Sequence, residues 1–234
     1  MRAALAFLTT LGGARGPEPG SLPWFPLVGL GIGLLVGAVW WGAAELWPPL
    51  AAAVVVVAAD AALTGLLHVD GLADAADGLF VHGATPARRL EIMRTPDVGA
   101  FGTTAVTFAL LGRVAGFATM APEPLLVAGL WTASRTVMAV SPALLPYARR
   151  EGLATGFLQR PPRRWPAVGL LVAAAFCVAA AGWGGAAALL ALLVTAGGVL
   201  LLAKQRLGGF TGDVLGATAV AGETVALLVA SARW

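Results

Sequence analysis

Long apolar segments constrain the fold of this chain more than any other feature. A helix that crosses a bilayer needs about 20 apolar residues. Seven segments approach or exceed that length, namely Trp24–Leu46, Leu50–Leu67, Thr103–Met120, Pro124–Leu145, Pro166–Trp183, Ala186–Ala203 and Asp213–Ala230. Only 12% of the residues are charged, about half the roughly 25% of soluble domains. The sequence predicts an all-α integral membrane protein, one polytopic domain over residues 1–234 with about seven transmembrane helices.

Positive charge is concentrated on one side of these segments. Twelve of the fifteen Lys and Arg residues precede the first segment or fall in the connections 68–102, 147–165 and 204–212. The opposite connections carry only Glu45 and Glu123, and Arg233 alone falls beyond the last segment on that side. Because Lys and Arg mark cytoplasmic loops, we expect the N-terminus and the three long connections in the cytoplasm. A basic, apolar chain also favours anionic lipid or phosphorylated substrates over nucleic acid.

The first 16 residues resemble a weak signal peptide, with Arg2 ahead of a short apolar stretch. No clear small-residue cleavage site follows. We therefore expect this segment to remain on the protein, lying along the membrane interface or re-entering the membrane.

An acidic cluster follows the second apolar segment. Asp70, Asp74 and Asp77 are spaced i, i+4, i+7, which places them on one face of a helix. Three like charges on one face repel each other, and Mg²⁺, which prefers oxygen ligands, is the simplest compensating ion. A solvated acidic face is the alternative, but the chain has few other polar residues. We expect these aspartates to bind Mg²⁺, whereas His68 could orient an aspartate, transfer a proton or hydrogen-bond at the interface.

A group of charged residues lies just downstream of the acidic cluster. It consists of Arg88, Arg89, Glu91, Arg94 and Asp97. Arginine pairs well with phosphate, but membrane topology alone also explains arginines in a cytoplasmic connection. Both interpretations stay open, and Arg94 is the best phosphate candidate because it is nearest the Gly99–Gly102 turn.

A glycine-rich segment with one acid begins the last apolar segment. Gly208, Gly209, Gly212 and Gly216 surround Thr211 and Asp213. Glycine allows a ligand to approach the backbone closely, although turns and helix packing also explain glycines. Because this segment lies on the same expected side as Asp70, Asp74 and Asp77, the two signatures predict one composite site.

Four ionisable residues fall deep inside the apolar segments: Asp60, Arg113, Arg135 and Glu223. Charges in the bilayer are costly unless they pair. At about 1.5 Å per helical residue, the four lie at similar depths. We expect them to meet at one level, as structural support beneath the site or as the floor of a polar cavity. Glycines at spacings of four in the first segment (Gly29, Gly33 and Gly37) indicate close helix packing.

The two signatures together resemble a known family. HVDGLADAADG (residues 68–78) and GGFTGDVLGA (residues 208–217) are similar to motifs of the cobalamin synthase family, the adenosylcobinamide-GDP ribazoletransferases. Shorter segments around Phe25, Leu90, Gly99 and Tyr147 also resemble the family, so the similarity covers nearly the whole chain. Where many members carry Asp-Ser-Arg, this chain has Thr95-Pro96-Asp97, so any role of that family aspartate has moved to Asp97 or is absent.

The resemblance implies a Mg²⁺-dependent reaction at the cytoplasmic membrane. Adenosylcobinamide-GDP would be joined to α-ribazole, or to its 5′-phosphate, giving adenosylcobalamin, or its 5′-phosphate, and GMP, in the last assembly step of the coenzyme B12 nucleotide loop. In this hypothesis metal binding falls to Asp70, Asp74 and Asp77, catalysis to His68, Asp70 and Asp213, and phosphate or substrate binding to Arg94, Arg149, Gly208, Gly209, Thr211 and Gly212. We expect membrane lipid as a partner, no nucleic acid, and an oligomer as an open possibility.

Two other classes of protein are compatible with parts of the sequence. A CDP-alcohol phosphotransferase also clusters aspartates at a cytoplasmic helix end, but it carries Asp-Gly-x-x-Ala-Arg and two later aspartates that this chain lacks. A transporter would use the buried charges as an ion path, but we find no repeated halves or paired broken segments of the kind that transporters contain. Turnover of a GDP-activated corrinoid to GMP separates the three.

Overall fold

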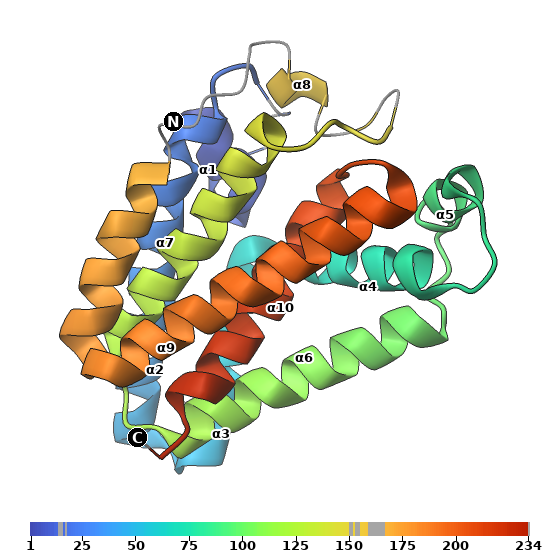
Figure 1. Ribbon diagram of the computed structural model, residues 1–234. Helices are drawn as coiled ribbons and strands as arrows, with labels where there is room; N and C mark the ends of the chain where they lie inside the picture. The colour runs from blue at the N-terminus through green and yellow to red at the C-terminus, as the bar shows by residue number, and fades with distance from the viewer. Residues whose placement is uncertain (14–15, 17, 150–151, 153–154, 159–166, 234) are drawn as a thin grey trace.

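The computed structural model describes residues 1–13, 16, 18–149, 152, 155–158 and 167–233. In this part of the chain the elements are helices, and strand-like pairing is limited to one isolated bridge between Tyr147 and Phe210. Ten helices, α1 to α10, and three short 3₁₀ turns are described, and Figure 1 shows their arrangement. The prediction of an all-α protein is confirmed.

The bounds of the elements follow the apolar pattern closely. The α-helices are α1 (Arg2–Leu8), α2 (Phe25–Leu46), α3 (Pro49–Thr64), α4 (Leu67–Phe80), α5 (Pro86–Ile92), α6 (Ala100–Thr119), α7 (Pro124–Val140), α8 (Thr155–Leu158), α9 (Val168–Leu207) and α10 (Gly212–Ala230). The 3₁₀ turns are η1 (Thr10–Gly12), η2 (Leu22–Trp24) and η3 (Ser141–Ala143). Proline occupies one of the first two positions of α2, α3 and α7, where its missing N–H costs the helix nothing.

Four of the described helices are long and apolar enough to cross a membrane, and the bent pair α3 and α4 makes a fifth candidate. Two of the seven expected segments, Pro166–Trp183 and Ala186–Ala203, form the single element α9, in which Ala181 and Gly182 leave the helical conformation. Figure 1 shows the chain changing direction sharply between the two parts of α9. The chain is a multi-helix membrane protein, whereas the number seven stays a prediction.

Close packing of α2 on α7 follows from the glycine spacing. A side chain added at Gly29, Gly33 or Gly37 would lie within 3.0 Å of α7 atoms. Bare glycine backbone therefore lets the two helices touch along their length, and the glycine face of α2 is used within the chain. Figure 1 shows α2, α7 and the first part of α9 side by side.

The connection expected over residues 68–102 is largely helical. α4 follows α3 after a bend of 89°, and in Figure 1 it runs nearly horizontally above α6. The bend is made by Gly65 and Leu66, which both have φ of 60°. A left-handed conformation is costly for leucine, so tertiary packing must hold this turn. We treat α4 as a helix outside the membrane-spanning segments.

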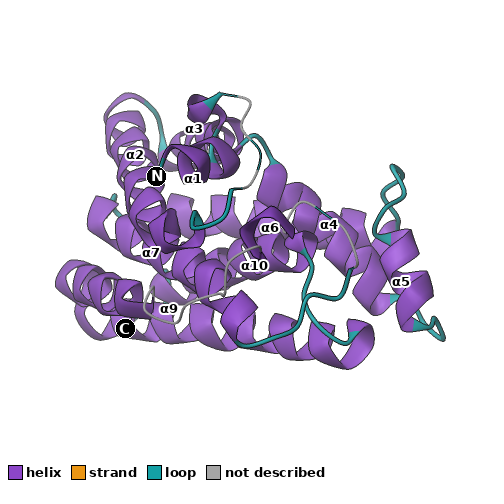
Figure 2. Cartoon of the chain, turned by 90° about the horizontal axis from the view of Figure 1, so that it is seen from above, coloured by secondary structure: helices purple, strands orange, loops and turns teal. Residues whose placement is uncertain are grey.

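The first residues form the short helix α1, which packs against the rest of the molecule. Its buried face contains Ala3, Ala4 and Leu8, and in Figure 2 it lies beside α2 and α3. Seven residues are too few to cross a bilayer. The expectation that this segment lies along the interface or re-enters the membrane stays a prediction.

Candidate active site

The candidate site lies where α4 packs on the beginning of α10. A side chain added at Gly71 would meet the Asp213 backbone at 3.0 Å, and one at Gly216 would meet the His68 backbone at 3.2 Å. The two glycines therefore permit the two helices to approach closely. The structure brings the two sequence signatures together across more than 130 residues, as the sequence predicted.

The glycines before α10 pair this segment with residues 146–148. Gly208 ends α9 with φ of 80°, a conformation that glycine adopts without strain. The Phe210 amide donates to the Pro146 carbonyl at 3.0 Å, and the Ala148 amide donates to the Phe210 carbonyl at 2.9 Å. A side chain at Gly209 would collide with the Pro146 carbonyl at 2.1 Å. The left-handed conformation at Gly208 and the close contact at Gly209 therefore account for glycine at both positions without a bound ligand.

The pairing of Phe210 with residues 146–148 places Arg149 next to Asp213. A guanidinium nitrogen of Arg149 lies 2.8 Å from the Asp213 carboxylate, and it also donates to the Met93 carbonyl at 3.3 Å. The Thr211 hydroxyl donates to the same carboxylate at 3.3 Å and accepts from the Val214 amide at 3.2 Å, capping α10. Arg149, Thr211 and Asp213 therefore form one polar cluster. The sequence did not indicate the pair between Arg149 and Asp213, and the phosphate role of Arg149 stays a prediction. Gly212, the first residue of α10, has open space where a side chain would point.

Asp74 lies in an excess of negative charge. Burial, with the carboxylates of Asp213 and Asp70 nearby, raises the pKa of Asp74 from 3.8 to about 7, and Arg149 only partly offsets this. Asp70 is exposed and Asp74 is half-buried. Asp70, Asp74 and Asp213 thus carry more negative charge than Arg149, which pairs with Asp213, can balance.

The third aspartate of the cluster has a different set of contacts. One oxygen of Asp77 accepts from the Gly99 amide at 2.7 Å, and the other accepts from the Gly102 amide at 2.9 Å. Gly99 and Gly102 are at the N-terminus of α6, where free amides need acceptors. Asp77 therefore caps α6 from a neighbouring helix, which the i, i+4, i+7 spacing did not indicate.

Two arginines neutralise the carboxyl end of α4. Arg89 donates to the carbonyls of Gly78 at 2.9 Å and Leu79 at 2.8 Å, and to Ala84 at 3.1 Å. Arg206 donates to the Leu79 carbonyl at 2.6 Å. Cations at a helix C-terminus satisfy its free carbonyls and its dipole. Arg89 is therefore a capping residue, whereas Arg94 is exposed in the turn after α5 and keeps its expected phosphate role as a prediction.

His68 lies beneath the acidic surface. Its side chain is buried, and neither ring nitrogen has a hydrogen-bond partner among the described residues. Burial, with the charges of Arg135 and Arg113 nearby, holds the pKa of His68 well below its usual value. His68 is therefore a neutral imidazole between the aspartates and the charges inside the membrane.

The four intramembrane ionisable residues form one network. Arg113 lies 2.6 Å from an Asp60 oxygen and 2.5 Å from a Glu223 oxygen, and Arg135 also pairs with Glu223. All four side chains are buried. The expectation that they meet at one level is correct, and the network joins α3, α6, α7 and α10.

Two partners in this network were missed from the sequence. The Trp131 indole donates to Asp60 at 3.0 Å, and the Ser134 hydroxyl donates to Glu223. The Arg113 guanidinium also stacks 5.3 Å from the Trp131 ring centre. Trp131 and Ser134 lie four residues and one residue before Arg135, so helical spacing could have indicated Trp131 as a neighbour on the same face.

No three of the His, Cys, Asp and Glu side chains in the described part of the chain are placed to hold a metal ion by themselves. This finding leaves the magnesium expectation untested, because Mg²⁺ is usually held by one or two carboxylates together with substrate phosphates. The oxygen donors of Asp70, Asp74 and Asp213 fit that chemistry. Five cations of the expected cytoplasmic connections, Arg15, Arg150, Arg160, Arg163 and Arg164, lie outside the described residues.

The fold and the site define a class of protein: a multi-helix membrane protein with a polar, mostly acidic site at the helix ends. Comparison with known proteins gives the family. The sequence profile of the Cobalamin-5-phosphate synthase family matches residues 1–231, and the chain belongs to this family.

Curated relatives align with nearly the whole chain. Proteins named adenosylcobinamide-GDP ribazoletransferase are 42% identical in Alkalilimnicola ehrlichii, covering 96% of this chain and 92% of the relative, and 39% identical in Syntrophobacter fumaroxidans, covering 91% and 85%. The protein of that name from Bradyrhizobium diazoefficiens is 38% identical, covering 99% and 93%. No solved structure matches the chain significantly.

Proposed function

We propose that this protein is an adenosylcobinamide-GDP ribazoletransferase of cobalamin biosynthesis. It would join adenosylcobinamide-GDP to α-ribazole, or to its 5′-phosphate, and release GMP. The observation that carries the proposal is the near-complete alignment with relatives of that name. The convergence of both family-like motifs at one open acidic surface supports it.

In the proposed chemistry, a phosphoanhydride bond breaks and a phosphate ester bond forms. The ribose hydroxyl of α-ribazole would form a bond to the phosphorus attached to cobinamide, and the bond from that phosphorus to the GMP oxygen would break. The hydroxyl proton would pass to a carboxylate of Asp70 or Asp213. We favour a carboxylate over His68 as the base, because the imidazole is buried beneath the cluster. Arg149 would bind phosphate oxygens, as its paired donors allow.

A divalent cation fits the uncompensated carboxylates of Asp70, Asp74 and Asp213. Bound there with the pyrophosphate, Mg²⁺ would neutralise charge on the reacting phosphoryl group. Asp77 is a weaker candidate ligand than expected, because both of its oxygens already accept backbone amides. Asp74, flanked by Asp70 and Asp213, has the strongest need for a cation.

We further propose that the protein resides in the cytoplasmic membrane with the N-terminus and the site facing the cytoplasm. The distribution of cations supports this orientation, since twelve of fifteen lie before the first span or in the connections on the site side. Cys177, the only cysteine, is buried. In a Cys177→Ala background, a cysteine at Arg88 should react with an impermeant thiol reagent only from the cytoplasmic side. A cysteine at Trp47 should react only from the opposite side, and the reverse pattern would contradict the orientation.

The decisive experiment is a product assay on protein purified in detergent or reconstituted in liposomes. Adenosylcobinamide-GDP and α-ribazole are supplied with Mg²⁺ or with EDTA, and cobalamin and GMP are quantified. Mg²⁺-dependent formation of both products is expected. Absence of product from folded protein would contradict the proposal and direct attention to phospholipid head-group transfer.

A further inference from the structure

Two arginines share one backbone oxygen at the carboxyl end of α4. Arg89 of α5 donates to the Leu79 carbonyl at 2.8 Å, and Arg206 of α9 donates to the same oxygen at 2.6 Å. Among the residues that the structure describes, neither arginine forms an ion pair with a carboxylate. Burial, with the charge of Arg206 nearby, lowers the pKa of Arg89. Two neighbouring cations are therefore held together without an acidic side chain between them.

The end of α4 balances only part of this charge. A helix C-terminus is equivalent to about half a negative elementary charge, whereas each of the two guanidinium groups carries a full positive charge. Glu91, the acidic residue of α5, pairs with Arg88 at 2.7 Å instead. Guanidinium groups bind phosphate oxygens through paired N–H donors. The excess positive charge at Arg89 and Arg206 thus favours a ligand that carries a phosphate.

The surrounding helices place the two arginines at the level of a membrane surface. Arg206 lies in the last turn of α9, and Phe101 lies in the first turn of α6. Both helices are long and apolar enough to cross a membrane, and these two ends are on the expected cytoplasmic side. Figure 1 shows the carboxyl end of α4 and the beginning of α6 on the same side of the molecule, close to α5. The arginines therefore lie where lipid headgroups are found.

Exposed aromatic side chains lie beside the arginines. Phe80 follows Leu79 in the chain, and its ring centre is 6.1 Å from that of Phe101. Phe80 is 48% exposed and Phe101 is 42% exposed, and Val98 in the turn before α6 is also exposed. Exposed apolar side chains at the end of a membrane-crossing helix are in reach of acyl chains. Apolar surface next to excess positive charge matches a molecule that joins an anionic head to apolar chains.

We infer that Arg89, Arg206, Phe80 and Phe101 form a binding site for an anionic phospholipid. The guanidinium groups would hold the headgroup phosphate, and the two rings would contact the upper part of an acyl chain. A soluble phosphate compound would use the arginines alone and leave both rings exposed, so the rings favour a lipid. None of these four residues belongs to the proposed catalytic or metal site, and the inference does not depend on the proposed reaction.

The first test titrates short-chain lipids into the purified protein in a neutral detergent. Dioctanoyl phosphatidylglycerol, dioctanoyl phosphatidylcholine and inorganic phosphate are compared at about 0.15 M salt, which screens distant charges. The unfolding temperature is followed, because a ligand of the folded state raises it. Phosphatidylglycerol should act at lower concentration than phosphatidylcholine, and inorganic phosphate should have little effect. Equal effects of the two lipids, or an equal effect of inorganic phosphate, would overturn the inference.

The second test locates the site on α9. Arg206→Gln should weaken the apparent affinity for phosphatidylglycerol about tenfold, as loss of a hydrogen bond between charged groups does. Lys204→Gln is the matched control and should stay within twofold. It removes the same charge from an exposed position in the same turn, but residues two apart on a helix point to nearly opposite sides. Equal losses in the two variants would indicate general attraction to a basic surface and contradict the site.

Further variants keep the inference testable if Arg206→Gln does not fold. Arg206→Lys retains the charge without the paired donors, and its affinity should fall between those of Arg206→Gln and the wild type. Phe80→Ser leaves both arginines intact and should weaken phosphatidylglycerol binding about fivefold, as loss of a partly buried ring does. Phe108→Ser, which changes an exposed phenylalanine elsewhere on α6, should have no effect. Binding unchanged in both Arg206→Lys and Phe80→Ser would show that the lipid binds elsewhere.

Discussion

Two clusters of charge in this molecule, one inside the membrane region and one at the helix ends above it, are built in opposite ways. The inner network pairs two arginines with two carboxylates, and all four side chains are buried and mutually bonded. The outer cluster sets Asp70, Asp74 and Asp213 against Arg149, which pairs with Asp213 at 2.8 Å, and it is partly exposed. The positive and negative charges of the inner cluster balance, whereas the outer cluster has an excess of negative charge.

The difference indicates separate roles for the two clusters. A network whose charges balance gains little from a ligand, and this one ties four helices together through its ion pairs. An unbalanced cluster open to solvent favours a cation and the phosphates that accompany it. Burial together with neighbouring like charges, as raises the pKa of Asp74 to about 7, is typical of functional sites. In this protein the buried, paired charges thus hold helices together, whereas the excess negative charge of the outer cluster is suited to binding a cation.

The largest expected effect is on activity, from the outer cluster. Asp74→Asn should lower turnover on the order of 10²–10³-fold, as loss of a group that stabilises developing charge does, while the protein still folds and inserts. Product formation and thermal unfolding are measured together. Glu45→Gln, which removes an exposed carboxylate near the end of α2, is the control and should retain activity. Turnover like wild type by Asp74→Asn would remove Asp74 from the metal site.

A substitution in the inner network should lower stability while leaving activity nearly unchanged. Glu223→Gln leaves Arg113 and Arg135 without a negative partner at that position, and breaking a buried pair costs about 3 kcal/mol or more. We expect a marked fall in the unfolding temperature in detergent, with turnover per folded molecule nearly unchanged. Thr224→Val, the neighbouring position that accepts only one bond from Arg113, should cost less. A Glu223→Gln protein that is stable but inactive would place this network in the reaction.

Two substitutions of Asp77 test whether this residue belongs to the proposed metal site or only caps α6. Because it caps α6 through Gly99 and Gly102, Asp77→Asn should keep part of the cap and reduce turnover less than tenfold. Asp77→Ala should lower stability by about 1 kcal/mol, as other lost N-caps do. A loss of activity in Asp77→Asn as large as that in Asp74→Asn would show that Asp77 binds the metal as well as the helix.

The smallest effect is expected at the carboxyl end of α4. Arg89→Ala removes bonds to the Gly78, Leu79 and Ala84 carbonyls and should lower the free energy of unfolding by about 1–2 kcal/mol. Arg88→Ala removes only an exposed pair with Glu91 at 2.7 Å and should change it by under about 0.5 kcal/mol. Chemical denaturation in a mild detergent compares the two. Equal effects would mean that Arg89 does not hold α4 in place.

Much of this architecture could be predicted because the bilayer imposes strict rules on sequence. The apolar segments, the acidic face of α4 and the meeting of Asp60, Arg113, Arg135 and Glu223 all follow from segment length, helical spacing and the cost of unpaired charge. The resemblance of residues 68–78 and 208–217 to one family could also be recognised from the sequence, because each motif is a short continuous segment.

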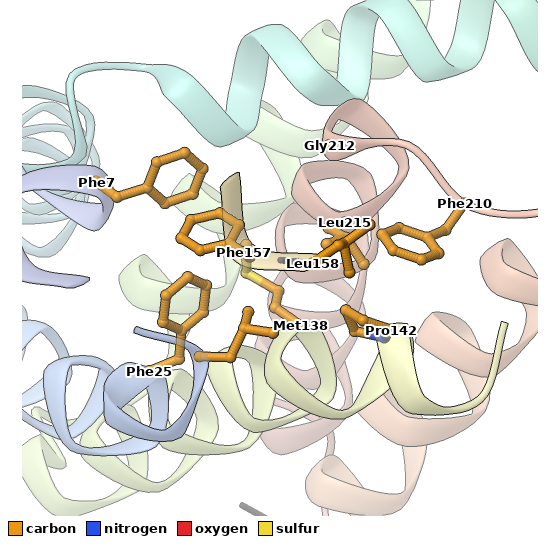
Figure 3. A pocket seen from close by; sticks show the side chains of 10 residues that line it. Phe7, Phe25, Met138, Pro142, Phe157, Leu158, Phe210, Gly212 and Leu215 are labelled. Carbon is orange, nitrogen blue, oxygen red and sulfur yellow. The ribbon is translucent and has the colours of Figure 1, made fainter. Parts of the chain in front are cut away.

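Other features depend on contacts that no local pattern encodes. The capping of α6 by Asp77 depends on the 89° bend between α3 and α4 at Gly65 and Leu66, whereas the expected metal role rested on spacing alone. The pairing of Phe210 with residues 146–148 explains Gly209 through a carbonyl far away in sequence. A small apolar hollow beside the first turn of α10 collects side chains from seven elements (Figure 3), so no single segment reveals it.

The sequence by itself determined that this chain is an all-α membrane protein of the cobalamin synthase type with an acidic site. Those properties depend on apolar length, on charge placement along the chain and on short motifs. Only the tertiary structure decided which charges are neutralised. Whether a carboxylate is a helix cap, half of an ion pair or an open ligand depends on the partners that folding brings within about 3 Å of it.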